Sequence, residues 1–157
     1  MSKPTARRPL VAHGGVRTSI VRCAVAALLV LLGIAWIVVY LNLAKDAAMY
    51  VPFPGTKKPV TPLPWMSDLK RWNFLIGFGL IFAGLVAAAD KSTPLGRGHG
   101  VVIGMLGCFL FGLVWIVTFY FVGQNASVPV MKDLNQYNLM VGIGFMAVGF
   151  TFATKWE

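Results

Sequence analysis

Few residues of this sequence could do chemistry, and their spacing does not suit a reactive site. The two cysteines, Cys23 and Cys108, lie far apart, whereas a metal or redox pair of cysteines needs close spacing. The two histidines, His13 and His99, form no pair that could ligate haem and no cluster with cysteine that could hold a metal. We therefore expect buried thiols that pack as small hydrophobes, and no metal, cofactor or catalytic residue.

The elements that would have to position any site are four long apolar runs. None of them contains Asp, Glu, Lys, Arg or His between its ends, and each is long enough to cross about 30 Å of hydrocarbon. The whole chain is 57% hydrophobic and 12% charged with a mean hydropathy of +0.73, which is not the composition of a soluble domain. The sequence predicts an all-α membrane protein with four transmembrane helices at residues 23–43, 72–89, 101–122 and 137–154.

The absence of charge within these runs excludes several functions. Enzymes and ion-coupled transporters need titratable groups at depth, and small multidrug exporters need a membrane-embedded carboxylate. The net charge of +9 does not indicate nucleic-acid binding, because the basic residues flank the apolar runs and five of the fourteen precede the first. We expect membrane lipid as a partner and no nucleic acid.

The chain is a tandem duplication. "WNFLIGFGLIFAG" at 72–84 matches "YNLMVGIGFMAVG" at 137–149 with an offset of 65, and "GIAWIVVY" at 33–40 matches "GLVWIVTF" at 112–119 with an offset of 79. The difference of 14 (79 − 65) is a longer connecting loop in the first copy. Each unit is a two-span hairpin, and repeats without inversion are related by an axis along the membrane normal. The predicted division is a basic cytoplasmic tail at 1–22 and two parallel repeats at 23–91 and 92–157.

Small residues within the runs predict close helix packing. Glycines seven apart share a helix face, glycines four apart form a GxxxG pair, and both arrangements let backbones approach closely in a bilayer. Two tryptophans lie in mid-span, where contact between helices is a better explanation than anchoring at the interface. A groove for a partner's span is the open alternative. The predicted packing residues are Gly77, Gly84, Gly100, Gly104, Gly142, Gly149, Trp36 and Trp115.

The basic residues before the first run predict that both termini are cytoplasmic and that the loops within each repeat face outward. The first of these loops, residues 44–71, contains five prolines and is expected to be extended rather than helical. It is either a stiff connector or a docking surface, and the basic tail either touches anionic lipid or binds a cytoplasmic protein. The candidate partner-binding residues are Arg7, Arg8, Arg17, Arg22, Trp65, Asp68 and Asp133.

The boundaries of the spans carry a family resemblance. The second repeat has "GLVWIV" at 112–117, "DLNQYN" at 133–138 and "TKW" at 154–156, and the first has "GIAWIV" at 33–38 and "DLKRWN" at 68–73. In these motifs each unit resembles CrgA, a family of small actinobacterial cell-division membrane proteins. Tyr137 stands where the family has Trp, the first repeat ends in "ADK" rather than a basic residue and Trp, and the chain is twice the usual two-span length.

The resemblance implies a non-enzymatic scaffold in the cell membrane at the division septum. Its implied partners are the tubulin-like division-ring protein and penicillin-binding proteins, which would bring cell-wall synthases to the septum. Self-association is a further expectation that the sequence leaves open. The alternatives are an accessory subunit of a larger membrane enzyme, such as a respiratory complex, and a small transporter or channel.

Overall fold

The structure, a computed structural model, describes residues 18–122 and 128–155. These residues form helices and connections without a strand. Two helical runs, Ile20–Ala48 and His99–Val122, are long and apolar enough to cross a membrane, and Trp72–Ala88 and Tyr137–Ala153 are shorter apolar helices. The all-helical fold is therefore confirmed.

The first helical run is longer than the sequence predicts. Helix α1 (Ile20–Val39) begins after Ser19, whose hydroxyl accepts a hydrogen bond from the backbone N–H of Arg22 at 3.4 Å. It continues through a π-helical turn, η1 (Tyr40–Ala44), into α2 (Lys45–Ala48). A widened turn displaces backbone donors from their usual acceptors, and the side-chain amide of Asn42 donates to the Val38 carbonyl at 2.8 Å.

The external loop of the first repeat is not wholly extended, contrary to the prediction. Besides α2, it contains α3 (Pro64–Asp68), which starts on a proline. Proline suits the first turn of a helix because that N–H has no intrahelical partner. The second repeat has a similar short helix, α6 (Pro129–Leu134), so each loop ends in a helical turn before the next long helix.

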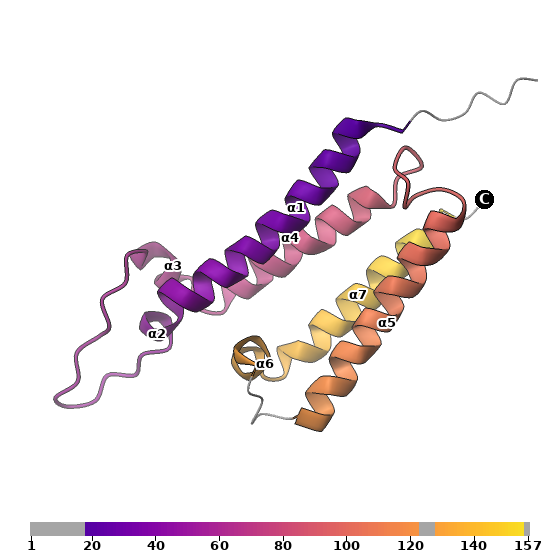
Figure 1. The fold of residues 1–157 in the computed structure, drawn as a ribbon. Coiled ribbons are helices and arrows are strands. Elements are labelled where there is room, and N and C mark those ends of the chain that lie inside the picture. Colours follow the sequence, from indigo (N-terminus) through magenta and orange to yellow (C-terminus); the bar gives the residue numbers. More distant parts are fainter. Residues whose placement is uncertain (1–17, 123–127, 156–157) are drawn as a thin grey trace, which may run out of the picture.

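The four long helices pack as two pairs that lie side by side (Figure 1). Helix α1 packs along α4 (Trp72–Ala88), and α5 (His99–Val122) packs along α7 (Tyr137–Ala153). The two pairs meet through α4 and α7. Helices α2, α3 and α6 lie at one end of this arrangement, while the start of α1, the α4–α5 connection and the end of α7 lie at the other (Figure 1).

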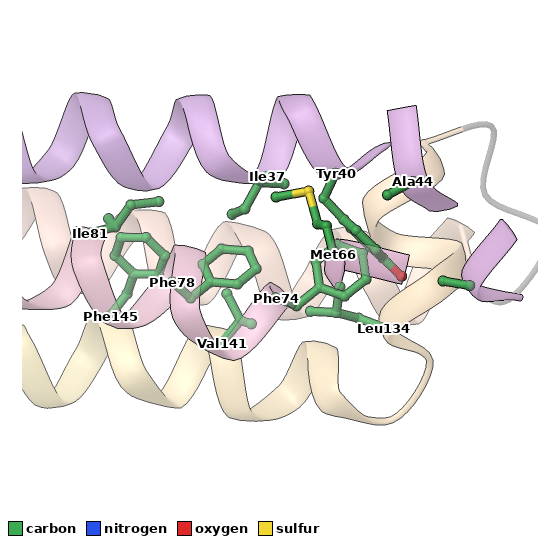
Figure 2. Packing of buried hydrophobic residues seen from close by; sticks show 11 residues of the cluster. Ile37, Tyr40, Ala44, Met66, Phe74, Phe78, Ile81, Leu134, Val141 and Phe145 are labelled. Carbon is green, nitrogen blue, oxygen red and sulfur yellow. The ribbon is translucent and has the colours of Figure 1, made fainter. Parts of the chain in front are cut away.

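Two clusters of buried apolar side chains join the pairs. The cluster near α2, α3 and α6 contains residues of both repeats, including Ile37, Phe78 and Phe145, and Figure 2 shows these side chains between the helices. The second cluster lies toward the opposite end and combines Ala88 of α4 with Val148 and Phe152 of α7. Burial of apolar surface thus connects the two repeats along the length of α4 and α7.

Candidate functional site

Glycines bring the backbones of α1 and α4 close together in the first repeat. A Cβ on Gly77 would collide with the Ile37 side chain and would lie 3.2 Å from the Gly33 carbonyl oxygen. A Cβ on Gly33 would lie 2.5 Å from the Gly77 carbonyl oxygen. About two turns further along the same face of α4, a Cβ on Gly84 would lie 2.8 Å from the Ala26 carbonyl oxygen. Only glycine permits this spacing of the two helices.

The second repeat reproduces the same contacts at equivalent positions. A Cβ on Gly142 would collide with Ile116 and would lie 2.9 Å from the Gly112 carbonyl oxygen. A Cβ on Gly149 would lie 3.1 Å from the Phe109 ring. Residues related by the offsets of 65 and 79 in the sequence therefore also make equivalent contacts in the structure.

The glycines of α5 differ from one another. Gly104 faces α7, because its Cβ would lie 2.5 Å from the Phe152 ring. At Gly100 the atoms nearest to an added Cβ belong instead to the preceding connection, at Pro94 and Leu95. At Gly107, within the part of the chain that the structure describes, no atom would lie within 4 Å of an added Cβ.

The two mid-span tryptophans have different neighbours. The Trp36 ring lies 5.7 Å from Trp65 in α3, so it contacts the external loop of its own repeat. The Trp115 ring lies 6.0 Å from Phe78 of α4 in an edge-on arrangement and therefore packs between the repeats. Both indole N–H groups are buried without an acceptor among the described residues.

Two asparagines are structural residues whose role sequence reasoning missed. Asn73 and Asn138 are fully buried. The Asn73 side-chain amide donates to the carbonyls of Met66 at 2.7 Å and Lys70 at 2.9 Å. Asn138 makes the equivalent bonds to Met131 at 2.6 Å and Asn135 at 2.8 Å. Each asparagine thereby fixes the short loop helix to the helix that follows. Its recurrence after an aromatic residue in both repeats is the signal that could have found it.

The residues at these two turns have positive φ angles, which explains why the turns need stabilising hydrogen bonds. Lys70 and Asn135 have φ values of 45° and 48°, which side-chain-bearing residues adopt at a cost. Their carbonyls are the ones that accept from Asn73 and Asn138. The buried amide therefore stabilises a turn that the backbone alone disfavours.

One ion pair crosses the junction between the repeats. The Lys45 ammonium in α2 lies 2.9 Å from Asp133 Oδ2 in α6, and these side chains are 24% and 10% exposed. The pair lacks the alignment of a hydrogen bond, because Asp133 Oδ2 has no such partner among the described residues. Asp68, at the equivalent position of the first repeat, is exposed.

A second ion pair lies at the opposite end. Arg22 Nη1 is 2.7 Å from Asp90 Oδ1, and the same carboxylate oxygen accepts from the Ser92 hydroxyl at 2.7 Å and the Ser92 backbone N–H at 2.9 Å. The Ser92 hydrogen bonds, and then Arg22, lower the pKa of Asp90 to about 2. Beside this pair is a groove of about 360 Å³ whose lining includes Val25, Val86 and Lys155.

The remaining candidate residues are dispersed. Arg7, Arg8 and Arg17 lie outside the described residues. Arg22 belongs to the first turn of α1, whereas Trp65 and Asp68 belong to α3, which lies at the opposite end (Figure 1). Trp65 is 49% exposed. Among residues 18–122 and 128–155, no group of three His, Cys, Asp or Glu side chains could hold a metal. Cys23 is half-buried, Cys108 is buried, and both are free thiols.

Comparison with known proteins gives one consistent result. The profile of the family described as "Cell division protein CrgA" matches the chain twice, over residues 2–90 and 86–157. A Streptomyces avermitilis protein of that name is 43% identical over 66 residues, which cover 42% of this chain and 75% of that protein. A Corynebacterium aurimucosum protein of the same name is 36% identical over 76 residues, covering 45% and 81%. No solved structure matches the chain significantly.

Proposed function

This chain belongs to the CrgA family of cell division proteins, and from that premise we propose that it is a non-catalytic scaffold of the division septum. In this role it helps to recruit or coordinate peptidoglycan-synthesis proteins and the division-ring protein. The observation that carries the proposal is the double family match, which covers both halves of the chain. A scaffold needs complementary surfaces and does not need a buried reactive group. Among the described residues, no group of three His, Cys, Asp or Glu side chains could hold a metal ion.

In the proposed membrane arrangement all four long helices span the bilayer. Helices α4 and α7 have 17 residues each, which is the lower limit for a span and corresponds to about 25 Å. Their packing along α1 and α5, which are long enough to span, supports this arrangement. The units are then a basic tail at 1–22, a first repeat at 23–91 and a second repeat at 92–157.

Both termini are cytoplasmic in this proposal. The basic residues before α1 favour retention of that end in the cytoplasm, and the start of α1 lies at the same end as the close of α7 (Figure 1). The groove lined by Arg22, Asp90 and Lys155 then faces the cytoplasmic leaflet. Because Asp90 already pairs with Arg22, Lys155 is the cation that would meet an anionic lipid headgroup.

The outer end offers the partner surface. Trp65 is half exposed and Asp68 is exposed, so both are available to an extracytoplasmic domain of a cell-wall synthase. Asp133 is engaged by Lys45 and is therefore assigned to the joint between the repeats. On the cytoplasmic side, Arg7, Arg8 and Arg17 are the proposed contacts for the division-ring protein, while Arg22 is engaged by Asp90.

Septal localisation tests this proposal. A fluorescent fusion produced in an actinobacterial host should concentrate at division sites, and affinity purification from its membranes should recover penicillin-binding proteins. A uniform distribution around the cell, together with co-purification of respiratory-complex subunits, would support an accessory-subunit role instead and would refute the scaffold role.

A further inference from the structure

Equivalent positions of α4 and α7 are buried on opposite flanks. Along α4 the more deeply buried flank is the one that follows the interface glycines Gly77 and Gly84, whereas along α7 it is the one that precedes Gly142 and Gly149. In both helices, the flank that follows the interface glycines is called flank A, and the flank that precedes them is called flank B. Flank A is Phe74, Phe78, Phe82 and Leu85 in α4 and Leu139, Ile143, Ala147 and Phe150 in α7. Flank B is Ile76, Leu80, Ala83 and Ala87 in α4 and Val141, Phe145, Val148 and Phe152 in α7.

The repeats meet through flank A of α4 and flank B of α7. The Phe82 and Phe145 rings are 5.0 Å apart in an edge-on arrangement, and Figure 2 shows Phe78 beside Val141 and Phe145. The Phe82 ring also occupies the space above Gly144, where an added Cβ would lie 2.5 Å from it. A glycine notch on one repeat thus receives an aromatic ring from the other.

The complementary flanks are less deeply buried within the described chain. On flank B of α4, Ile76, Leu80 and Ala87 are half-buried and Ala83 is exposed. Next to flank B of α4, no described atom would lie within 4 Å of a Cβ on Gly79, the counterpart of Gly144.

On flank A of α7, Ile143 is 50% exposed, whereas its counterpart Phe78 in α4 is 8% exposed. Phe150, on the same flank of α7, is 61% exposed. The Phe150 ring packs on Phe109 of its own repeat, 5.0 Å away.

This pattern is that of a head-to-tail contact. A two-fold axis would bury the same positions in both repeats, because each surface would meet its own copy. Here each flank position of α4 differs in burial from its counterpart in α7. The ion pair is asymmetric in the same way. Asp133 is paired across the junction by Lys45, whereas the equivalent Asp68 is exposed.

We propose that copies of this chain associate head to tail in the membrane, with flank A of α7 in one copy packed on flank B of α4 in the next. The occupant is a second copy because the repeats already show which surface fits flank B. Both complementary flanks are wholly apolar, and Ala147 would meet Gly79 and Ala83, so the backbones can approach more closely than at the internal contact. A head-to-tail contact continues until its rotation closes a ring, and otherwise forms an open row.

Cysteine cross-linking in native membranes tests the direction of this contact. Leu80 and Ala147 are the counterparts of Phe145 and Phe82, whose rings lie 5.0 Å apart. In a background with Cys23→Ala and Cys108→Ala, the full chain carrying both Leu80→Cys and Ala147→Cys should form a ladder of cross-linked oligomers. Chains carrying one substitution each should form dimers only when both are co-expressed. A Leu80→Cys chain that cross-links to itself, or the absence of any ladder, would overturn the proposal.

A second measurement separates a specific surface from general crowding. Gly79→Leu fills the notch next to flank B and should reduce the cross-linked fraction about tenfold, because overpacking an interface commonly costs this much in affinity. Gly107→Leu is the matched control, since a Cβ there also meets no described atom within 4 Å but lies on α5, outside both flanks. An equal effect of the two substitutions, or a ladder that survives Gly79→Leu, would contradict the assigned surface.

Discussion

Lys45 and Asp133, which belong to different repeats, bring opposite charges to within 2.9 Å at the end of the molecule formed by the loop helices. Both side chains are less than one-quarter exposed, so the pair is screened less than a surface ion pair. It ties α2 to α6 at the point where the two helix pairs meet. The repeats are therefore joined by charge at one end and by apolar packing along α4 and α7.

Asp133→Asn should destabilise the folded protein because it leaves the Lys45 ammonium without its counter-charge. The expected loss is about 1–2 kcal/mol, between the values typical of surface and fully buried pairs. Thermal unfolding in detergent measures it, with Asp68→Asn as a matched control that should change little. In the charge-swapped protein, Lys45→Asp with Asp133→Lys, part of the stability should return, and a swap no better than the single substitutions would argue against direct pairing.

Gly77→Ala and Gly142→Ala should each separate one helix pair. The added Cβ collides with Ile37 or Ile116, and overpacking of this kind costs about 1–3 kcal/mol. The two effects should be similar in size, because the surroundings of the two glycines are equivalent. Resistance to unfolding by a denaturing detergent is a suitable readout, and Gly107→Ala should leave it unchanged. A large effect at Gly107 with none at Gly77 would reverse the assignment of the packing faces.

The pairing within each repeat could be predicted from sequence, because close helix contact requires glycine and leaves a visible pattern. The shared offsets relate Gly77 to Gly142 and Trp36 to Trp115. The direction of contact between the repeats could not be predicted. Flank A and flank B are both apolar, and a pattern of apolar residues does not show which of the two flanks packs against the other repeat.

The loop ends could not be predicted, for two physical reasons. Proline favours extended chain in general, whereas Pro64 stands at the first turn of α3, where its missing N–H costs nothing. A single polar residue such as Asn73 belongs to no apolar repeat, so the sequence pattern does not show that it is buried. Its role depends on carbonyls of Met66 and Lys70 that come close only after the turn has formed.

Asn73→Ala should loosen the junction between α3 and α4. The substitution removes hydrogen bonds to two carbonyls, and loss of a buried hydrogen bond costs about 1–3 kcal/mol when its partner is left unpaired. Hydrogen exchange should therefore speed up at Lys70 and at the first turn of α4, with the middle of α4 little affected. Asn138→Ala should do the same in the second repeat, and unaltered exchange in both variants would contradict a fixing role.

The Asp90 carboxyl should titrate near pH 2, below its ordinary 3.8, because Ser92 and Arg22 stabilise the charged form. Since the folded-state pKa is lowered, the associated stability is fully present above about pH 4 and is lost as the pH falls through about 2. Carboxyl NMR measures the midpoint directly. Ser92→Ala should raise the midpoint because it removes the hydroxyl hydrogen bond, the largest cause, while the backbone N–H bond remains. Arg22→Gln should also raise it by removing the positive charge. A midpoint unchanged in both variants would contradict these contacts.

An impermeant thiol reagent applied to intact cells should label a cysteine in the first external loop and none at the opposite end. In the background without Cys23 and Cys108, Lys57→Cys lies in the exposed segment between α2 and α3, and Leu95→Cys lies in the α4–α5 connection, where the native side chain is 39% exposed. Because the basic residues before α1 favour a cytoplasmic amino terminus, Lys57→Cys should react in intact cells and Leu95→Cys only after lysis. Reaction of both before lysis would mean that α4 does not cross the bilayer. Reaction of Leu95→Cys alone would mean that the whole arrangement is inverted.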